Sequence, residues 1–346
     1  MEQVRVGVVG TGRMGRNHCR IFSILRNATL VGISDQNPAV GRNVAREYAV
    51  PFFPNIDELL PHVDAISLAV PTPLHYGLAL RCIEQGVHVF VEKPITESLD
   101  DAGELVLAAD RSDLTVQVGH IERFNPTYTE LKNVLEDLTP LAINFQRLSP
   151  YVGSNTDVDV VLDLMIHDLD LALDMVGEMP TSITASGITA MSGAVDHAVV
   201  GLRFSQGPLL TLTASRLTEQ KVRQVEITAL EAFVQADLLN KSVAVHRSMV
   251  GEYLNGGSQR GVKYRQESVV ERIHVPIAEP LYLELQHFVE SIRTRRQPLV
   301  TARDGALALE LAHRIRQELR GQLLDAASLR SKPMESSAIL EVAEVA

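Results

Sequence analysis

Tryptophan is absent from the 346-residue chain, and cysteine is scarce, with only Cys19 and Cys82. Two cysteines in separate amphipathic segments exclude a disulfide-rich framework and predict buried, unpaired thiols in a reducing compartment. No apolar run reaches the roughly 18 residues that cross a bilayer. The amino terminus also lacks the basic-then-apolar order of a signal peptide. We therefore expect a cytoplasmic protein without membrane insertion.

Positive charge is also in short supply, with 32 Lys and Arg against 43 Asp and Glu, a net charge of −11. This balance argues against a surface that binds nucleic acid or an anionic membrane. An apolar content of 45% and a charged content of 22% are ordinary for a globular protein. The length predicts about two domains.

The amino-terminal segment has the pattern of a dinucleotide-binding unit. A short apolar strand, Gln3–Val9, leads into Gly10–Gly15, which has the form G-x-G-x-x-G, and an amphipathic segment follows. A second strand, Ala28–Ser34, ends at Asp35, 20 residues after Gly15. Strand, glycine loop, helix, strand and acid in this order predict a nucleotide site. The alternative is a glycine-rich turn in an ordinary α/β unit.

Each residue of this motif has an expected task. Gly10 allows a tight turn, Gly12 lets the backbone approach a pyrophosphate, and Gly15 lets the helix pack closely on the sheet. The helix amino terminus offers free N–H groups to the phosphates. Asp35 would accept hydrogen bonds from a ribose diol and repel a 2′-phosphate, which favours NAD over NADP.

The chain divides into two parts with different patterns. Strands alternate with helices through residues 1–122, which predicts an α/β domain with a Rossmann doubly wound parallel sheet. Residues 123–330 contain a long helix, Val158–Met175, and then successive strands, which predict an α+β domain with an open, mainly antiparallel sheet. We expect a mobile loop at Met249–Gly261 and a tail at residues 331–346.

The strands of the second domain carry more apolar residues than one helix-covered face is expected to bury. This count predicts that a second copy covers the other face, giving a homodimer or homotetramer through the open sheet. The residues concerned are Val200, Leu202, Leu210, Leu212 and Ile227.

Ligands of an open parallel sheet bind beyond the carboxyl ends of its strands. One such end is Val70–Thr72, with His75 just beyond, and another is Val91–Pro94. Lys93 in the second segment could hydrogen-bond a substrate hydroxyl and stabilise a developing alkoxide. The alternative is a solvated lysine at a strand end.

A second polar group lies on the long helix. Asp163 and His167 are four residues apart, on one helical face, and an Asp–His pair suits proton transfer. The alternatives are a surface contact or a metal site, although no third ligand has recognisable spacing. Asp170 and Asp174 are expected on the solvated side. At the domain junction Glu122, Arg123 and Asn125 could line the cleft, with Arg123 binding an anionic group.

Three motifs in order resemble the glucose–fructose oxidoreductase, inositol dehydrogenase and rhizopine-catabolism family over residues 1 to about 321. They are the glycine motif, Glu92–Pro94, and the Asp-x-x-x-His of residues 163–167. The resemblance implies a Rossmann domain, an open-sheet second domain, tightly held NAD(P), a cis peptide before Pro94 and oligomerisation through the sheets. We expect no metal, because no third ligand has recognisable spacing.

The resemblance also implies roles for individual residues. The catalytic set is Lys93, Asp163 and His167, with His167 as base oriented by Asp163, although Lys93 and His167 could exchange roles. The nucleotide is held by Gly10, Thr11, Gly12, Arg13, Met14, Gly15 and Asp35. The nicotinamide side is lined by Val70, Pro71, Thr72, His75, Glu92, Lys93 and Pro94. The substrate would meet Lys93, Glu122, Arg123, Asn125, Asp163 and His167.

A narrower likeness rests on residues 119–126 and 157–168, which resemble UDP-N-acetylglucosamine 3-dehydrogenases. It implies oxidation of the sugar C3 hydroxyl to a ketone, which a downstream aminotransferase aminates on the route to lipid A and lipopolysaccharide. The alternatives are an inositol, a free sugar or another UDP-sugar as substrate. A non-catalytic NAD-sensing protein of the same fold is the alternative outside the enzymes.

Overall fold

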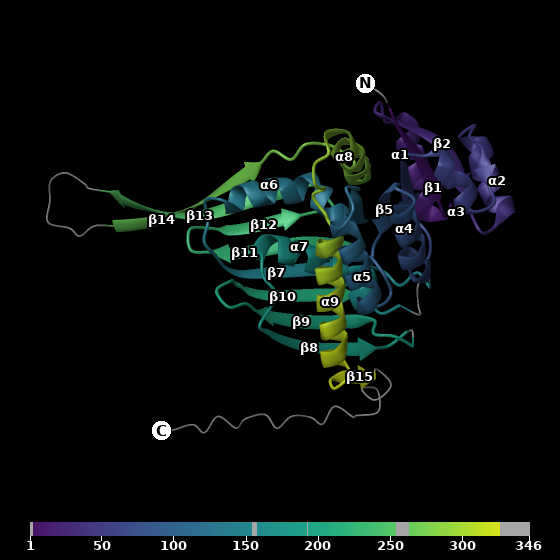
Figure 1. Ribbon diagram of the computed structural model, residues 1–346. Coiled ribbons are helices and arrows are strands. Elements are labelled where there is room, and N and C mark those ends of the chain that lie inside the picture. The colour runs from purple at the N-terminus through teal and green to yellow at the C-terminus, as the bar shows by residue number, and fades with distance from the viewer. Residues whose placement is uncertain (1–2, 154–157, 192, 254–262, 326–346) are drawn as a thin grey trace.

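The computed structural model describes residues 3–153, 158–191, 193–253 and 263–325 of the chain (Figure 1). Within these residues the strands form one sheet of six and one of nine. Helices cover both sheets and run between them.

The first sheet is parallel throughout, with the strand order β3-β2-β1-β4-β5-β6. Apolar strands buried on both faces, such as β1 and β4, suit a sheet that helices cover on two sides. The predicted Rossmann sheet is confirmed. Its strands are β1 (Val4–Val9), β2 (Ala28–Ser34), β3 (Phe52–Phe53), β4 (Ala65–Leu68), β5 (His88–Glu92) and β6 (Val116–Gly119). Its helical segments are α1 (Arg13–Ile24), α2 (Pro38–Glu47), α3 (Ile56–Leu59), η1 (Leu60–His62), η2 (Thr72–Leu74), α4 (His75–Glu84), α5 (Leu99–Asp110) and η3 (Ile121–Phe124).

The second sheet has the order β14-β13-β12-β11-β7-β10-β9-β8-β15 and is mainly antiparallel, as predicted. It is not a simple meander, because β7 lies in the middle and runs parallel to β10, and β15 runs parallel to β8. Helix α7 (Ile166–Val176) carries the chain from β7 toward the far edge, and β8 to β10 then return to β7. The strands are β7 (Pro140–Leu148), β8 (Ser182–Thr189), β9 (His197–Arg203), β10 (Leu209–Ser215), β11 (Val222–Ala229), β12 (Phe233–Asp237), β13 (Ser242–Tyr253), β14 (Lys263–Ile273) and β15 (Leu323–Asp325).

The hairpin of β13 and β14 extends beyond its neighbours (Figure 1). Residues 249–253 belong to β13, so the predicted loop is wrong in its first part. Residues 254–262, the rest of that loop, and the predicted tail at 331–346 lie outside the described residues.

The apolar residues that suggested a second buried face all lie on the helix-covered face. Val200 is directly opposite Leu212, Leu202 is opposite Leu210, and all four are in the core with Ile227. Helices α6 (Pro126–Leu135), α7 and α9 (Ala302–Leu319) lie over this face (Figure 1). The other face exposes mostly polar side chains. The apolar residues therefore do not require a second copy of the chain to bury them, and that argument for a dimer was wrong. The polar side chains of the other face include Thr184, Thr211, Gln224, Thr228 and Gln235.

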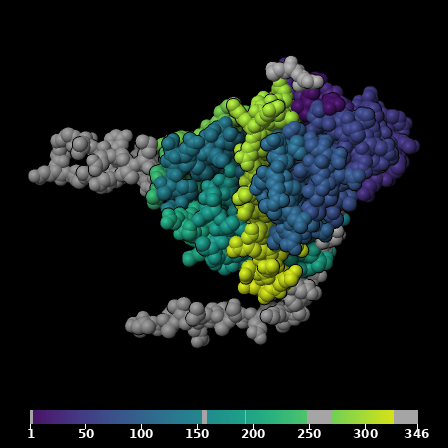
Figure 2. Space-filling view, viewed as in Figure 1, coloured from purple at the N-terminus to yellow at the C-terminus, as the bar shows by residue number. Residues whose placement is uncertain are grey.

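The carboxyl-terminal helices join the two sheets. Leu285 and Phe288 of α8 (Pro280–Thr294) share a core with Phe90 of the first sheet. Helix α9 contributes Leu309 to the first domain's core and Ile315 to that of the second. In Figure 2 these helices form a yellow-green band between the purple-blue and teal parts. The predicted boundary at 122/123 therefore separates the sheets but not the helices that pack on them.

Both cysteines are buried and free, as predicted, and burial raises the pKa of each thiol to about 12. Among the helices that the structure describes, none combines the length and the hydropathy needed to cross a membrane. The location in the cell stays a prediction.

Candidate active site

The glycine loop leaves β1 in a turn that needs glycine. Gly10 has φ +84°, and a Cβ there would lie 2.5 Å from the Ala69 carbonyl oxygen. A Cβ at Gly15 would lie 1.8 Å from the Gly10 carbonyl oxygen, so Gly15 is required by the turn itself, in addition to the expected helix packing. A Cβ at Gly12 would meet nothing within 4 Å, which leaves the backbone open on its outer side.

This open side fits the pyrophosphate of a dinucleotide. Gly12 is the N-cap of α1 and supplies no side-chain cap, so the first N–H groups of the helix lack a capping side chain. Such a terminus attracts anions. Asp35 directly follows β2, and its carboxylate accepts hydrogen bonds from the N–H and Oγ1 of Thr11 at 2.6 and 2.5 Å and from the N–H of Asn37 at 2.7 Å. Arg13 is exposed and Met14 is partly buried beside them.

Lys93 follows β5 and points from the first domain to the second. Its Nζ donates a hydrogen bond of 2.9 Å to the main-chain carbonyl of Asp163 and lies 4.0 Å from the Asp163 carboxylate. Its side chain is 19% exposed. Burial lowers the pKa of Lys93, although Asp163 and Glu92 act in the opposite direction. The Lys93–Pro94 peptide is cis, as the resemblance implies.

The helix that carries Asp163 is not regular at its start. Residues Val161–Met165 form a π-helix before α7 begins, with the N–H of Ile166 reaching back to the Val161 carbonyl. The prediction of one continuous α-helix over residues 158–175 is wrong here. Asp159 caps the segment by accepting hydrogen bonds from the N–H groups of Val161 and Leu162. Such wide turns are frequent at functional sites.

His167 lies in the first turn of α7, in the same charged surroundings as Lys93. Its Nδ1 is buried and has no hydrogen-bond partner among the described residues. Burial, and then the charges of Lys93 and Arg147, lower the pKa of His167 well below its ordinary value. The imidazole is therefore neutral at neutral pH.

His18, a buried histidine that the sequence interpretation treated as structural, contacts Glu92, the residue before Lys93. His18 of α1 places Nδ1 2.7 Å from Ser67 Oγ and Nε2 3.1 Å from Glu92 Oε1. Burial raises the pKa of Glu92, but the hydrogen bond and charge of His18 and the charge of Lys93 outweigh it, so the pKa is lowered. Glu92 thus places a negative charge beside the ammonium group of Lys93.

His75 joins the segment that follows β4 to the segment that follows β5. Its Nδ1 lies 2.8 Å from the Pro94 carbonyl oxygen and its Nε2 lies 2.9 Å from that of Val70. The ring is buried, whereas Pro71 is exposed and Thr72 is partly buried. Both nitrogens of His75 thus face the protein's own backbone.

Arg123 has partners within the protein. Its guanidinium contacts Asp170 at 2.8 Å and Asp174 at 2.6 Å, and its side chain is 5% exposed. The expectation that Asp170 and Asp174 face solvent is wrong, because Asp170 is 1% exposed and Asp174 is 16% exposed. These contacts neutralise Arg123, so the structure favours a role in joining η3 to α7 over binding a substrate anion.

Glu122 and Asn125 are also engaged within the protein. Asn125 caps α6 and donates to Glu122 Oε2 at 3.0 Å. Glu122 accepts from Arg147 at 3.0 Å and from Arg223 at 3.3 Å. The sequence interpretation missed both arginines. The alternation Ile143, Phe145, Arg147 along β7 was an available signal, since it turns a charge inward.

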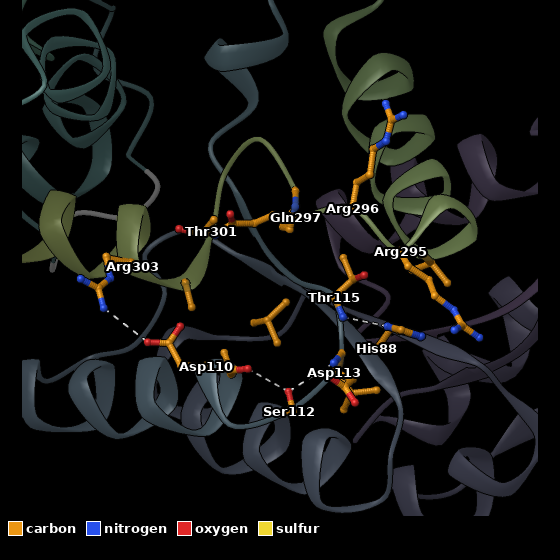
Figure 3. Close-up of a pocket in the computed structure, with 16 residues that line it drawn as sticks. His88, Asp110, Ser112, Asp113, Thr115, Arg295, Arg296, Gln297, Thr301 and Arg303 are labelled. Atoms are coloured by element: carbon orange, nitrogen blue, oxygen red, sulfur yellow. Dashed lines mark hydrogen bonds and ion pairs between the residues drawn. The ribbon is translucent and has the colours of Figure 1, made fainter.

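A hollow of about 770 Å³ lies at the amino-terminal ends of strands β5 and β6 of the first sheet (Figure 3). It is lined by His88 at the start of β5 and by Thr115 beside β6, whereas Lys93 follows the opposite end of β5. Arg303 pairs with Asp110 on its wall. The hollow is therefore separate from the candidate active site. Within the described part of the chain, no group of three His, Cys, Asp or Glu residues is arranged to hold a metal ion.

Two family descriptions match the chain. Residues 4–120 match the oxidoreductase family GFO_IDH_MocA with an NAD-binding Rossmann fold, and residues 146–233 match a GFO/IDH/MocA carboxyl-terminal domain. Together they cover the whole first sheet and, in the second, the end of β7 and strands β8 to β11. Helices α6, α8 and α9 and nearly all of strands β12 to β15 lie outside the matched residues.

The relatives include UDP-N-acetylglucosamine 3-dehydrogenase of Acidithiobacillus ferrooxidans, 29% identical over 91% of this chain and 97% of the relative. A solved structure of that enzyme has a TM-score of 0.83 at 28% identity, covering 93% of this chain and 99% of the other. Myo-inositol 2-dehydrogenase of Thermotoga maritima is 27% identical over 91% of this chain and 96% of the relative. The chain thus belongs to the GFO/IDH/MocA oxidoreductase family and is an NAD-dependent dehydrogenase that acts on a sugar hydroxyl.

Proposed function

We propose that the protein oxidises the C3 hydroxyl of UDP-N-acetylglucosamine to the 3-keto sugar. The likeness to the Acidithiobacillus enzyme over nearly the whole length of both chains supports this substrate. The sequence around Gly119–Pro126 and Asp157–Asp168 supports it too. The keto product would then be aminated by an aminotransferase on the route to lipid A.

The observation that carries the proposal is the meeting of Lys93 with the Asp163 segment across the domain junction. When bound, NAD supplies the acceptor for the hydride that leaves the oxidised carbon. The glycine loop would hold its pyrophosphate through Gly10, Thr11, Gly12, Arg13, Met14 and Gly15, and Asp35 would hold its ribose. Val70, Pro71, Thr72, His75, Glu92 and Pro94 would border the nicotinamide side.

Lys93 is the better proton acceptor of the two candidate bases. A general base works best with a pKa near the working pH. Burial moves the pKa of Lys93 toward neutrality from above, whereas it moves that of His167 farther below neutrality. We therefore assign the hydroxyl proton to Nζ of Lys93 and a hydrogen bond from the neutral His167 ring to the same oxygen.

Asp163 would orient the acceptor. Its main-chain carbonyl accepts from Nζ of Lys93, and its carboxylate at 4.0 Å favours the ammonium that forms when the proton arrives. The ammonium would then stabilise negative charge on the substrate oxygen. The contact with His18 lowers the pKa of Glu92, and the Glu92 carboxylate in turn favours the ammonium form of Lys93.

The test is NADH formation, followed by absorbance, with UDP-N-acetylglucosamine, UDP-glucose, glucose and myo-inositol as alternative substrates. We expect turnover with UDP-N-acetylglucosamine and a product that carbonyl-trapping reagents and mass spectrometry place at C3. Turnover of myo-inositol alone would instead favour the second candidate, an inositol dehydrogenase, which the Thermotoga relative supports at 27% identity. NADH from none of these would count against both.

We also propose that the open face of the second sheet joins copies of the chain. Leu209, Ala142, Thr228 and Phe233 form one row across four adjacent strands of that face. Leu209 is 54% exposed and Phe233 is 36% exposed. Leu209 and Phe233 thus place exposed apolar side chains on an otherwise mostly polar face, and such side chains mark association surfaces. Light scattering at micromolar concentration should give at least a dimer mass, and a monomer mass would contradict the proposal.

A further inference from the structure

Arg223 and Arg147 lie directly opposite each other on the neighbouring strands β11 and β7. Both belong to the helix-covered face, at the strand ends that approach the candidate active site. Their charges both lower the pKa of His167, which places them in the surroundings of that ring. Two guanidinium groups side by side require anions to balance them.

The two arginines are unequally supplied with anions. Arg147 is 3% exposed, and its Nε and Nη2 contact Asp168 at 2.9 and 2.7 Å while its Nη1 contacts Glu122 at 3.0 Å. Arg223 is 40% exposed. Among the described residues its Nη1 contacts Glu122 Oε1 at 3.3 Å, the same oxygen that Arg147 contacts at 3.0 Å.

The electrostatics agree with this geometry. Burial and then Arg147 lower the pKa of Arg223, and Glu122 and Asp168 offset this only in part. Burial also acts to lower the pKa of Arg147, but Asp168 and Glu122 outweigh it and raise that pKa. Arg223 is thus the less well compensated cation, and part of its side chain is open to solvent. A bound anion at this position would restore the balance and would meet a guanidinium suited to bidentate contact with phosphate.

We infer that Arg223 binds the anionic group of the substrate, the diphosphate of a nucleotide sugar, and so selects a charged sugar over an uncharged one. This inference rests on the proposed function, since it assigns the diphosphate to the same site as Lys93 and His167. It replaces Arg123, which the sequence interpretation had considered for an anion and which is neutralised by Asp170 and Asp174.

The experiment compares Arg223→Gln and Arg223→Lys with the unchanged full chain at saturating NAD. We expect Arg223→Gln to raise KM for UDP-N-acetylglucosamine by about tenfold to a hundredfold, the usual effect of losing a hydrogen bond between charged groups. The value of kcat should stay within about threefold, because Lys93 and His167 are unchanged. Arg223→Lys should fall between the two, since it keeps the charge but loses the planar fork.

The matched control is Arg203→Gln, which removes an exposed arginine from the opposite face of the same sheet. Calorimetric binding of UDP alone provides a readout without turnover, and thermal melting verifies that each variant is folded. We expect UDP binding to weaken in Arg223→Gln and to be unchanged in Arg203→Gln.

The outcomes separate this inference from the proposed reaction. Equal UDP affinity in Arg223→Gln and the unchanged protein would overturn the inference, even if UDP-N-acetylglucosamine is oxidised. Absence of UDP binding in the unchanged protein would overturn it as well. UDP binding that depends on Arg223, without oxidation of UDP-N-acetylglucosamine, would support the anion site and contradict the reaction.

Discussion

Lys93 and Glu284 illustrate how burial sets the charge of single side chains in this protein. Burial lowers the pKa of Lys93, and the nearby carboxylates of Asp163 and Glu92 oppose this shift. Glu284 of α8 is 1% exposed, and neither carboxylate oxygen has a hydrogen-bond partner among the described residues. Burial, and then the charges of Glu92, Asp170 and Glu122, raise its pKa well above the ordinary value. Burial therefore favours the protonated form of Glu284.

The roles of Lys93 and His167 predict different pH profiles. Neutral Lys93 is the competent form, so kcat/KM should rise with pH until the pKa of Lys93 is passed. Lys93→Ala should lower turnover about 10²- to 10⁴-fold and abolish this rise, with NAD binding little changed. His167→Ala should also lower turnover but keep the rising limb. Loss of the limb in His167→Ala and its retention in Lys93→Ala would exchange the two roles.

Glu284→Gln should stabilise the protein at neutral pH. The unfolded chain releases the Glu284 proton above its ordinary pKa, whereas the folded chain retains it, so stability falls as pH rises between the two values. Each pKa unit of difference is worth about 1.4 kcal/mol. The melting temperature of Glu284→Gln should exceed that of the unchanged protein at about pH 8 and approach it at about pH 5. A difference that does not vary with pH would contradict a protonated Glu284.

Among the elements, the turn from β1 into α1 has the strictest backbone requirement. Gly10 and Gly15 are needed because of contacts inside the turn, whereas Gly12 faces open space. The π-helical segment before α7 is the counterpart in the second domain, and it presents a main-chain carbonyl to Lys93. Both elements therefore place backbone groups, and not only side chains, at the site.

The glycine turn allows a matched pair of substitutions. Gly15→Ala places a methyl group against the Gly10 carbonyl and should cost about 1–3 kcal/mol of stability as well as NAD affinity. Gly12→Ala meets no protein atom, so the melting temperature should be unchanged while NAD affinity falls. Calorimetry with NAD and denaturant unfolding measure the two effects. Undiminished NAD binding in Gly12→Ala would argue against a pyrophosphate at this position.

For the whole molecule, the important contacts are those that join the two domains. Arg123 of η3, at the domain junction, pairs with Asp170 and Asp174 of α7. Asp174 also contacts Tyr128 and Lys132 of α6, within the second domain. Helices α8 and α9 add apolar contacts to both cores. This combination holds Lys93 and His167 in one site although they come from different domains.

Arg123→Ala should therefore destabilise the whole chain strongly. It leaves Asp170 buried without its main cation, which typically costs about 3–5 kcal/mol. Arg5→Ala, which removes the exposed pair with Asp64, should cost less than about 1 kcal/mol. Urea unfolding at neutral pH compares the two. Equal losses in both variants would show that the Arg123 pairs add nothing beyond a surface ion pair.

The sequence by itself determined the features that depend on neighbours along the chain. The glycine loop, the alternation of strands and helices, the position of Lys93 at a strand end and the polar pair on the long helix are all local patterns. Only the tertiary structure decided which distant groups meet. Arg123 and Asp170 are 47 residues apart, Arg223 and Glu122 are 101 apart, and Gln117 and Glu284 are 167 apart. Such neighbours decide burial and charge, so the partners of Arg123, the neutrality of His167 and the faces of the second sheet could not be read from local periodicity. The π-helix over Val161–Met165 also escaped, because the apolar pattern of this short segment fits a regular α-helix as well.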